Sequence, residues 1–415
     1  MTLAVSLLDA SPADVERDIG EAYALVRAFD SDGAWSKDAD PHADFAALRR
    51  RRPVHGSTWE RVLTGADLTD TASTPVWHVV SFAAAERVLR DEDTFSSSAY
   101  DDSMGRVVGR SFLQMDQEEH RSWRNVLHAG MNRQTVLAHR AQIRSSLAAR
   151  LADTLARPGG DLVADVAFPV ALTTIARLIG LPPGTRIGTL YAWAVGLTED
   201  PGHRMADAMG ELLAMPSAWP PGSLVDLLSR ADSPAIGSGP QLLPAVRLLL
   251  STGTEPPFRS LATLMYAVLS DRTVLESLRA DPSIAPAVFH ECWRWECPLT
   301  WALRRCTTDT EVAGQSMGRG DLVCVNLASA NRDEARWSHA DRFDARREYL
   351  PSLALGTGPH LCLGRHLAAV EAHELLSELA SLAPFRWTLD TDGPVGRGFR
   401  SARRLRVNSR PGQGL

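Results

Sequence analysis

One cysteine is bracketed by glycines near the end of the chain, in the stretch Leu355-Gly-Thr-Gly-Pro-His-Leu-Cys-Leu-Gly364. Glycine tolerates positive φ angles and close backbone contacts, so this stretch predicts a tight loop just before a helix. A thiol at a helix N-terminus lies near free N–H groups and the positive end of the macrodipole, which favour the thiolate. Cys362 therefore suits an anionic sulfur ligand to iron, although a lone turn of this kind also fits a buried structural cysteine.

Pairs of charged side chains occur at helical spacing in two other stretches. Glu291 and Arg294 stand three residues apart, and His120 and Arg124 stand four apart, so each pair shares a helix face. Taken singly, such residues are usually solvated surface charges. They point to a site only in combination with the cysteine loop.

The pattern Gly-x-Gly-x-His-x-Cys-x-Gly, followed by Leu367, Ala368 and Glu371, resembles the haem-binding loop of the cytochrome P450 family, soluble bacterial branch. The resemblance implies haem b as the cofactor. It makes Cys362 the thiolate ligand of the iron and places His360 at a haem propionate. The family's aromatic residue at the start of this loop is a leucine here.

The same resemblance assigns roles to the charged pairs. Glu291 and Arg294 match the family's Glu-x-x-Arg motif, whose structural triad would be completed by Arg342, the basic residue before Phe343. The haem propionates are anionic and need fixed cations. The residues expected to hold the cofactor, beside the ligand itself, are His120, Arg124, Arg304, His360, Gly356 and Gly364.

The family's oxygen-side helix carries a small residue, a glycine, an acid and a threonine. The matching residues here, and the candidates for catalysis, are Thr252, Gly253, Glu255 and Pro256. Pro256 stands at the threonine position, lacks a hydroxyl and removes a backbone N–H, so a kinked or widened helix is expected there. Either water or substrate replaces the hydroxyl, or the chemistry differs, as in oxidative ring formation, carbon–carbon or carbon–nitrogen coupling, or use of peroxide.

Substrate contacts are expected, by the same resemblance, from the loop at 96–112, the region 185–220, the distal helix and the turn near 395–399. The individual candidates are Leu113, Leu299, Thr300, Trp301 and Phe399. Arg259 lies near the distal helix break and is either an anchor for a substrate carboxylate or a salt-bridged arginine.

Composition narrows the class of protein. The 415 residues include 44 basic and 50 acidic side chains, a net charge of −6, and Lys37 is the only lysine. A mildly acidic chain without a long basic run is a poor nucleic-acid binder. No uncharged apolar run approaches the ~20 residues of a membrane span, and residues 1–8 do not resemble a signal peptide. The odd number of cysteines, without a Cys-x-x-Cys pair, favours a reduced, cytoplasmic chain.

Helical spacing dominates the middle of the chain, over about 116–285. A helix is expected at 41–50, a strand at 76–80, an apolar helix at about 242–271 and short strands after about 300. The pattern predicts a mainly α fold with a minor β part, and the resemblance implies the triangular P450 fold as one domain over 1–415. Residues 1–40 show no strong periodicity and are expected to form an N-terminal extension, ordered only in part.

No Gly-x-Gly-x-x-Gly motif for a flavin or nicotinamide and no cysteine cluster for iron–sulfur is present. The resemblance therefore implies a haem-thiolate monooxygenase that receives electrons from a separate ferredoxin and an NAD(P)H-dependent ferredoxin reductase. The expected substrate is a hydrophobic, natural-product-like small molecule of secondary metabolism. The alternatives are a peroxide-dependent enzyme and a non-catalytic haem protein that binds a ligand.

Overall fold

The computed structural model describes residues 7–31, 40–58, 75–198, 201–233, 235–382 and 386–410. Helices in this part of the chain are α2 (Pro12–Ser31), α3 (His42–Arg51), α4 (Phe82–Arg90), α5 (Met104–Val108), α6 (Gln117–Met131), α7 (Arg133–Ala138), α8 (Arg140–Ala156), α9 (Phe168–Ile179), α10 (Ile187–Ala194), α11 (Pro201–Leu213), α12 (Leu224–Ser229), α13 (Leu243–Thr252), α14 (Glu255–Ser270), α15 (Arg272–Ala280), α16 (Ala285–Trp295), α17 (Leu327–Ala330) and α18 (Arg365–Ser381). The strands are β1 (Val54–Thr58), β2 (Pro75–Val79), β3 (Phe95–Ser96), β4 (Ala302–Cys306), β5 (Thr310–Val312), β6 (Gln315–Met317), β7 (Leu322–Val325), β8 (Arg386–Thr391), β9 (Pro394–Val395), β10 (Ser401–Ala402) and β11 (Leu405–Arg410).

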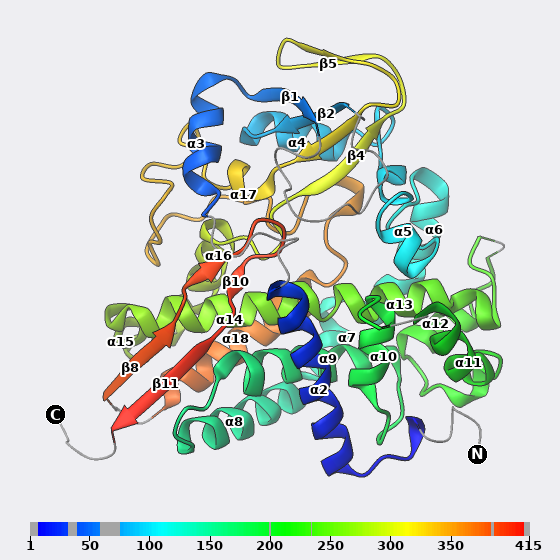
Figure 1. Cartoon of the computed structure of the whole chain (residues 1–415), viewed down its shortest axis with the longest axis vertical. Helices are drawn as coiled ribbons and strands as arrows, with labels where there is room; N and C mark the ends of the chain where they lie inside the picture. The colour runs from blue at the N-terminus through cyan, green and yellow to red at the C-terminus, as the bar shows by residue number, and fades with distance from the viewer. Residues whose placement is uncertain are drawn as a thin grey trace.

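Strands and long helices occupy different parts of the molecule. A five-stranded sheet of order β1-β2-β7-β4-β3 lies at the top of Figure 1, with α3, α4 and α17 beside it. Helices α8, α9, α14 and α18 cross the lower part, and the antiparallel pair of β8 and β11 lies at one end of them. The predicted mainly α fold with a minor β part is confirmed.

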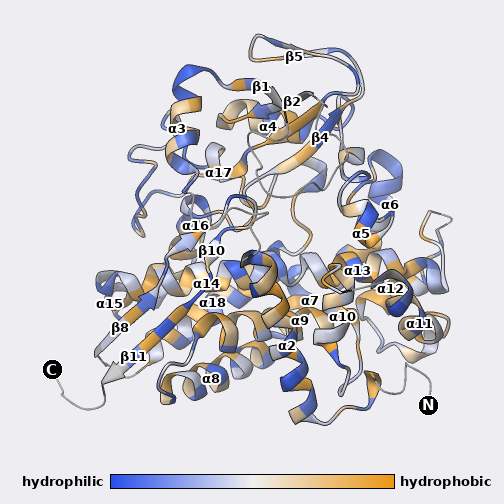
Figure 2. Ribbon diagram, viewed as in Figure 1, coloured by the Kyte–Doolittle hydropathy of each residue, from blue (hydrophilic) through white to orange (hydrophobic). Residues whose placement is uncertain are grey.

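The main core forms between the lower helices because their apolar residues recur at helical spacing. Leu147 and Leu151 of α8 and Leu172 and Ile175 of α9 are almost completely buried in one cluster. Figure 2 shows these helices with orange and blue faces, as expected when one side of a helix packs inward. Among the described helices, none combines the length and apolar content that a bilayer crossing needs.

Several predicted elements lie where the sequence placed them. Strand β2 and helix α3 match the expected strand at 76–80 and helix at 41–50 to within a residue, and the Asp40 carboxylate accepts the His42 N–H at 3.1 Å. The segment 96–112 was expected to be a loop, but it contains a 3₁₀ turn over Ser97–Tyr100 and helix α5. The hydroxyl of Ser96 starts that turn by accepting the backbone N–H of Ser98 at 3.0 Å.

The expectation that the N-terminal segment lacks strong periodicity is wrong for residues 12–31. Residues 1–6 and 32–39 lie outside the described residues, but Pro12–Ser31 forms the 20-residue helix α2, which packs on α10. Ile19, Tyr23 and Val26 are buried at positions i, i+4 and i+7, a helical period. The Asp18 carboxylate accepts the N–H of Gly188 at 2.7 Å, which fixes α2 against the start of α10. Helix α2 is therefore an integral part of the helical core.

The expected apolar helix at about 242–271 is two helices. Helix α13 ends at Thr252 and α14 begins at Glu255, with Pro256 and Pro257 in the first turn of α14. Proline fits a first turn because its missing N–H would have no partner there, whereas inside a helix it would disrupt the hydrogen-bond ladder. The predicted kink at Pro256 is confirmed as a complete break.

Candidate functional site

The loop before α18 is fixed by its glycines and by one backbone hydrogen bond. Gly356 and Gly358 have φ angles of 70° and 71°, which favour glycine. A Cβ on Gly358 would lie 2.8 Å from the Cα of Arg90, so only glycine lets the loop approach the end of α4. The N–H of Cys362 donates to the carbonyl of Leu355 at 2.8 Å, which closes the loop just before α18.

Cys362 is partly accessible, whereas the other four cysteines are buried. Its sulfur is nevertheless enclosed, and this burial raises the pKa of the Cys362 thiol. The N–H of Gly364 and the charges of Arg124 and Arg365 lower the pKa, but by less. The N–H at the helix terminus therefore favours the thiolate as expected, but desolvation outweighs it in the side chain without a bound metal. A cationic metal at the sulfur would reverse the balance, since coordination deprotonates a thiol.

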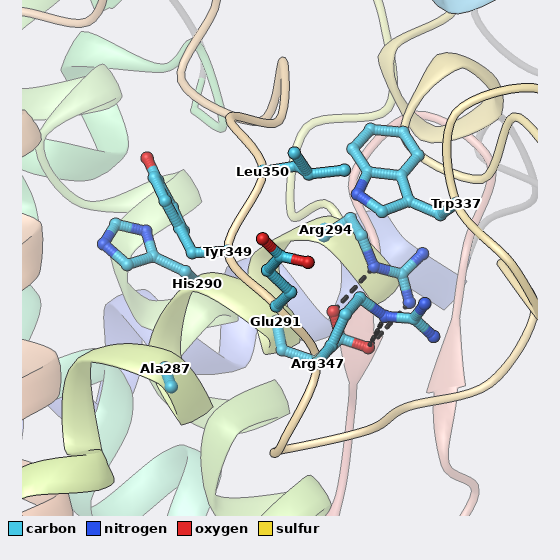
Figure 3. Close-up of a pocket in the computed structure, with 9 residues that line it drawn as sticks. Ala287, His290, Glu291, Arg294, Trp337, Arg347, Tyr349 and Leu350 are labelled. Atoms are coloured by element: carbon cyan, nitrogen blue, oxygen red, sulfur yellow. Dashed lines mark hydrogen bonds and ion pairs between the residues drawn. The ribbon is translucent and has the colours of Figure 1, made fainter.

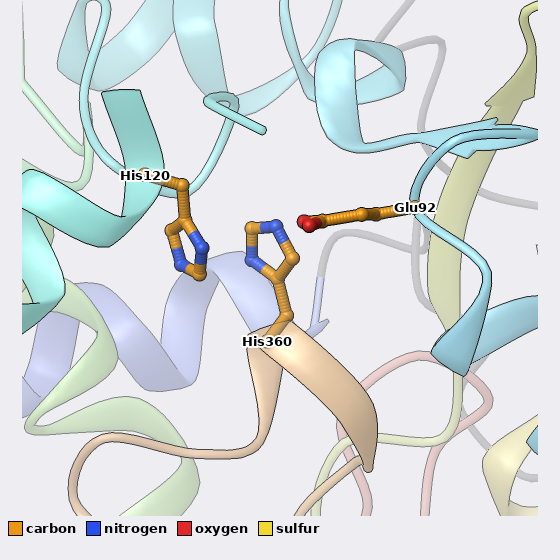
Figure 4. A group of neighbouring side chains, drawn as sticks. All are labelled: Glu92, His120 and His360. Carbon is orange, nitrogen blue, oxygen red and sulfur yellow. The ribbon is translucent and has the colours of Figure 1, made fainter. Parts of the chain in front are cut away.

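Two histidines stack beside the loop. The rings of His120 on α6 and His360 lie with centroids 3.9 Å apart and planes at 17° (Figure 4). Nε2 of His360 lies 3.0 Å from the hydroxyl of Ser97 and 3.7 Å from the carboxylate of Asp116. Burial, with the nearby His360 and Arg124, lowers the pKa of His120 to about 3, and burial also lowers the pKa of His360. Both rings are therefore neutral hydrogen-bonding groups at pH 7.

A carboxylate lies next to these rings. Figure 4 shows Glu92 directed at His360, and one ligand atom from each of Glu92, His120 and His360 lies within 4.8 Å of the others. Such a group could hold a metal ion, but Glu92 also lies 3.7 Å from Arg121. The family resemblance predicts that both histidines contact the haem propionates, and that prediction offers an alternative to a metal site for this group.

Two arginines place their positive charges near the histidines and Cys362. In the described part of the chain, no carboxylate lies at ion-pair distance from either arginine. The charge of buried Arg304, on β4, acts on both histidines, and that of Arg124, on α6, acts on Cys362. The one hydrogen bond of Arg304 is to the neighbouring carbonyl of Leu303, at 2.7 Å. Burial lowers the pKa of both arginines. Arg304 is buried and Arg124 is half-buried, and a buried cation without a counter-charge is unfavourable, so the two arginines fit a dianionic group such as the two propionates of haem.

Glu291 on α16 holds two arginines in a buried network (Figure 3). Nε and Nη2 of Arg294 donate to its two oxygens at 2.7 and 2.8 Å, and Nε of Arg347 donates at 3.0 Å. The prediction that Arg342 completes this group is wrong, because its side chain is exposed and only its carbonyl takes part, accepting from Arg294 at 2.8 Å. The N–H of Asp344 donates to Glu291 at 2.9 Å, and the turn that follows returns the chain so that Arg347 reaches the carboxylate.

Glu255, the acid at the distal break, is engaged at both oxygens. The hydroxyl of Tyr191 on α10 donates to Oε1 at 2.7 Å, and Nε of Arg259 donates to Oε2 at 2.8 Å. The two Nη atoms of Arg259 donate to Asp30 of α2 at 3.1 and 3.2 Å. Arg259 is thus the salt-bridged arginine of the two alternatives. Glu255 is held as a partner in a buried network of four side chains, which joins α2, α10 and α14.

The other residues of the break have local roles. The hydroxyl of Thr252 donates to the carbonyl of Leu248 at 2.7 Å, although the residue is exposed. Gly253 is needed for packing, because a Cβ there would collide with Ile175 of α9. Pro256 is partly buried at the start of α14. No hydroxyl stands at its position.

Three of the predicted substrate residues lie beside this network. Leu299 and Phe399 pair across a β-bridge, and the Thr300 hydroxyl and N–H donate to the Gly398 carbonyl at 2.9 and 3.0 Å. The guanidinium of Arg259 lies 5.3 Å from the ring centroid of Phe399. The segment after α16 and the C-terminal turn therefore meet at the distal network, as a shared substrate wall would require.

The two remaining substrate candidates pack around a second cluster. Trp301 is buried in a cluster with Tyr100 and Leu303, and Leu113 packs against that cluster.

Three residues in the networks around Glu291 and Glu255 were not among the predicted site residues: Asp30, Tyr191 and Arg347. The apolar period of α2 is a signal that could have led to Asp30. A lone tyrosine in an apolar helix gives no sign of its partner, so Tyr191 had no local signal. Arg342, Arg346 and Arg347 lie in one short segment, so the sequence does not show which of them reaches Glu291. The turn after Asp344 brings Arg347 to the carboxylate.

Known proteins are similar to this chain over most of its length. The family profile described as Cytochrome P450 matches residues 266–401. The erythromycin C-12 hydroxylase of Saccharopolyspora erythraea is 32% identical over 351 residues, which cover 78% of this chain and 86% of that protein. Cytochrome P450 monooxygenase PikC of Streptomyces venezuelae is 29% identical over 370 residues, covering 85% and 86%. The crystal structure of a post-tailoring hydroxylase (HmtN) involved in himastatin biosynthesis has a TM-score of 0.76 at 25% identity, covering 91% of this chain and 98% of that one.

Proposed function

Because the chain belongs to the cytochrome P450 family, whose members are haem-thiolate monooxygenases, we propose that it oxidises a hydrophobic, natural-product-like small molecule with Cys362 as the haem ligand. The observation that carries the proposal is that the cysteine loop, two stacked histidines, buried Arg304 and half-buried Arg124 lie together, with no carboxylate of the described residues at ion-pair distance from either arginine. Support for the substrate class comes from relatives named for erythromycin and himastatin tailoring. The whole chain acts as one domain in this proposal.

Each of these residues would make a different contact with the cofactor. Bound haem supplies the activation of oxygen. Cys362 would hold the iron from the α18 side, with the Gly364 N–H donating to the sulfur. Arg124 and Arg304 would neutralise the propionates, and His120 and His360 would offer them hydrogen bonds. Gly358 lets the loop pack closely against the end of α4, because it carries no side chain.

The distal side differs from the family pattern, which supports unusual proton delivery. The position of the usual threonine hydroxyl is Pro256, and both oxygens of Glu255 accept hydrogen bonds within a fixed network. A carboxylate with both oxygens occupied is a poor proton carrier, because it must break an ion pair before it can accept or release a proton. This favours substrate-assisted protonation, oxidative ring formation or coupling. The second candidate, a peroxide-dependent enzyme, is favoured by the same observation.

Electrons would come from a separate ferredoxin and an NAD(P)H-dependent reductase in the cytoplasm. Support comes from the sequence, which holds no flavin, nicotinamide or iron–sulfur motif, and from Arg365, whose charge lies near Cys362 and suits an acidic carrier.

A reduced carbon monoxide difference spectrum tests the proposal. The wild type should give the red-shifted Soret band of a thiolate-ligated haem. Cys362→Ser should lose it, whereas Cys306→Ser, at a buried cysteine outside the pocket, should keep it. Absence of the band in the wild type would overturn the proposal. Turnover with a surrogate ferredoxin chain but not with peroxide identifies the monooxygenase, and the reverse identifies the peroxide-dependent enzyme.

A further inference from the structure

Arg247 on α13 is a buried cation without a counter-charge among the described residues. The residue is 8% exposed, and its one hydrogen bond within that part of the chain, from Nη2 to the carbonyl of Trp193, is long at 3.4 Å. Its Nε is buried and has no hydrogen-bond partner there. No carboxylate of the described residues lies at ion-pair distance from Arg247, and burial lowers the pKa of its guanidinium.

Arg247 differs from most other buried arginines of the described chain, which have carboxylate partners. Arg259 donates to Asp30 and Glu255, and Arg294 donates to Glu291. Arg304 also lacks an ion pair, but it faces the cofactor pocket, where two propionates would compensate it. The same argument leaves Arg247 in need of an anion from outside the chain, because an isolated buried charge is otherwise strongly unfavourable.

The position of Arg247 indicates where that anion would come from. Trp193, its hydrogen-bond partner, belongs to α10, and a Cβ on Gly196 just beyond that helix would lie 3.3 Å from Val107 of α5. A Cβ on Gly109, at the end of α5, would lie 3.1 Å from Pro244 of α13. Arg247 therefore lies where α5, α10 and α13 meet. The first two belong to segments 96–112 and 185–220, expected to contact the substrate, and the third leads to the distal break.

We propose that Arg247 is the recognition site for a carboxylate on the substrate, so that the substrate combines an apolar body with one acidic group. This rests on the proposed function. Nε and Nη2 form one edge of the guanidinium, and a carboxylate can accept from both in parallel. Nε is unpartnered and the bond of Nη2 is long, so this edge is available for such a pair.

The proposal has a consequence for stability that a purely structural arginine would not share. If Arg247 is uncompensated in the substrate-free protein, a neutral side chain of similar length should relieve the unfavourable burial. Arg247→Met should therefore raise Tm by about 2 °C while it weakens ligand binding. Arg259→Met removes a paired arginine from the neighbouring helix and should lower Tm, since it leaves two carboxylates without their partner.

Binding to the haem-loaded full chain tests recognition directly. The probes are octanoate, decanoate, phenylacetate and the methyl ester of each, titrated by the shift of the Soret band. At least one acid should bind wild type about tenfold more tightly than its ester, the discrimination expected of a charge-assisted pair. Arg247→Met should lose the preference, and Arg247→Lys should retain part of it. Arg204→Met, which removes an exposed charge from α11, should behave as wild type.

Three results would each overturn the proposal: no acid preferred over its ester by wild type, an unchanged preference in Arg247→Met, or a lower Tm in that variant. The carbon monoxide spectrum, recorded first on each protein, distinguishes these results from failure of the proposed function. A protein that shows the thiolate band but does not prefer an acid over its ester is a P450 that binds its substrate without using Arg247.

Discussion

Nε of Arg347 lies 3.0 Å from the carboxylate of Glu291, while the side chain of Arg342, the residue expected to complete this triad, is exposed. The carbonyl of Arg342 accepts hydrogen bonds from Arg294 and Arg347, at 2.8 and 3.3 Å. The role in the Glu291 network that the sequence assigned to Arg342 alone is thus shared by the carbonyl of Arg342 and the side chain of Arg347.

Arg347→Met should lower the free energy of unfolding by about 3 kcal/mol, because it leaves a buried carboxylate with one partner fewer. Arg342→Met should change it by less than about 0.5 kcal/mol, since its carbonyl remains. Denaturant unfolding of both variants measures the difference. Equal losses in the two proteins would contradict the assignment.

The network of Asp30, Arg259 and Glu255 should show strong non-additivity. Asp30→Asn or Glu255→Gln alone leaves Arg259 with one anionic partner, and each should cost about 1–2 kcal/mol. The double variant leaves a buried cation with none, and should exceed the sum of the single losses by about 2 kcal/mol. Glu21→Gln, on the exposed face of α2, is the control and should have no effect. Simple additivity in a double-mutant cycle would exclude shared compensation of Arg259.

Replacement of Pro256 separates the effect of the missing hydroxyl from that of the helix break. Pro256→Thr and Pro256→Ala both restore the N–H, but only the first adds a hydroxyl. If the hydroxyl limits ordinary oxygen activation, product formed per NAD(P)H consumed should rise in Pro256→Thr and not in Pro256→Ala, with the rise up to about tenfold. An equal response of the two variants would assign the effect to the backbone.

Glu371 should make stability fall as pH rises. It is 1% exposed on α18, and burial raises its pKa to about 8, against a hydrogen bond from Thr174 that lowers it. The folded state keeps a proton that the unfolded chain releases above the ordinary glutamate pKa of 4.5, so the stabilisation is complete below that pH. It is lost as pH rises to about 8 and amounts to at most about 5 kcal/mol.

Glu371→Gln cannot ionise, so its stability relative to wild type should increase from pH 5 to pH 8, roughly the interval between the two pKa values. Denaturant midpoints at several pH values within this range measure the trend. Glu378→Gln on the same helix, whose partner is Arg144, is the control and should run parallel to wild type. A wild-type curve parallel to that of Glu371→Gln would show that Glu371 is not the titrating group.

Much of the cofactor site could be predicted because its determinants are local. The glycines around Cys362, the spacing of His120 and Arg124, and the helix after the loop depend on neighbours in the chain, and backbone sterics alone restrict their conformations. The break at Pro256 was foreseeable for the same reason, since proline acts on its own helix turn.

Long-range packing decided the rest. Glu255 accepts hydrogen bonds from Tyr191, 64 residues earlier in the chain, and from Arg259, which also donates to Asp30, 225 residues before Glu255. These partners meet only when α2, α10 and α14 come together. The raised pKa of Cys362 and the uncompensated charge of Arg247 likewise result from burial, which is a property of the assembled core. Charges in a sequence are known before folding, but their solvation and their partners come from segments that only the tertiary structure brings together.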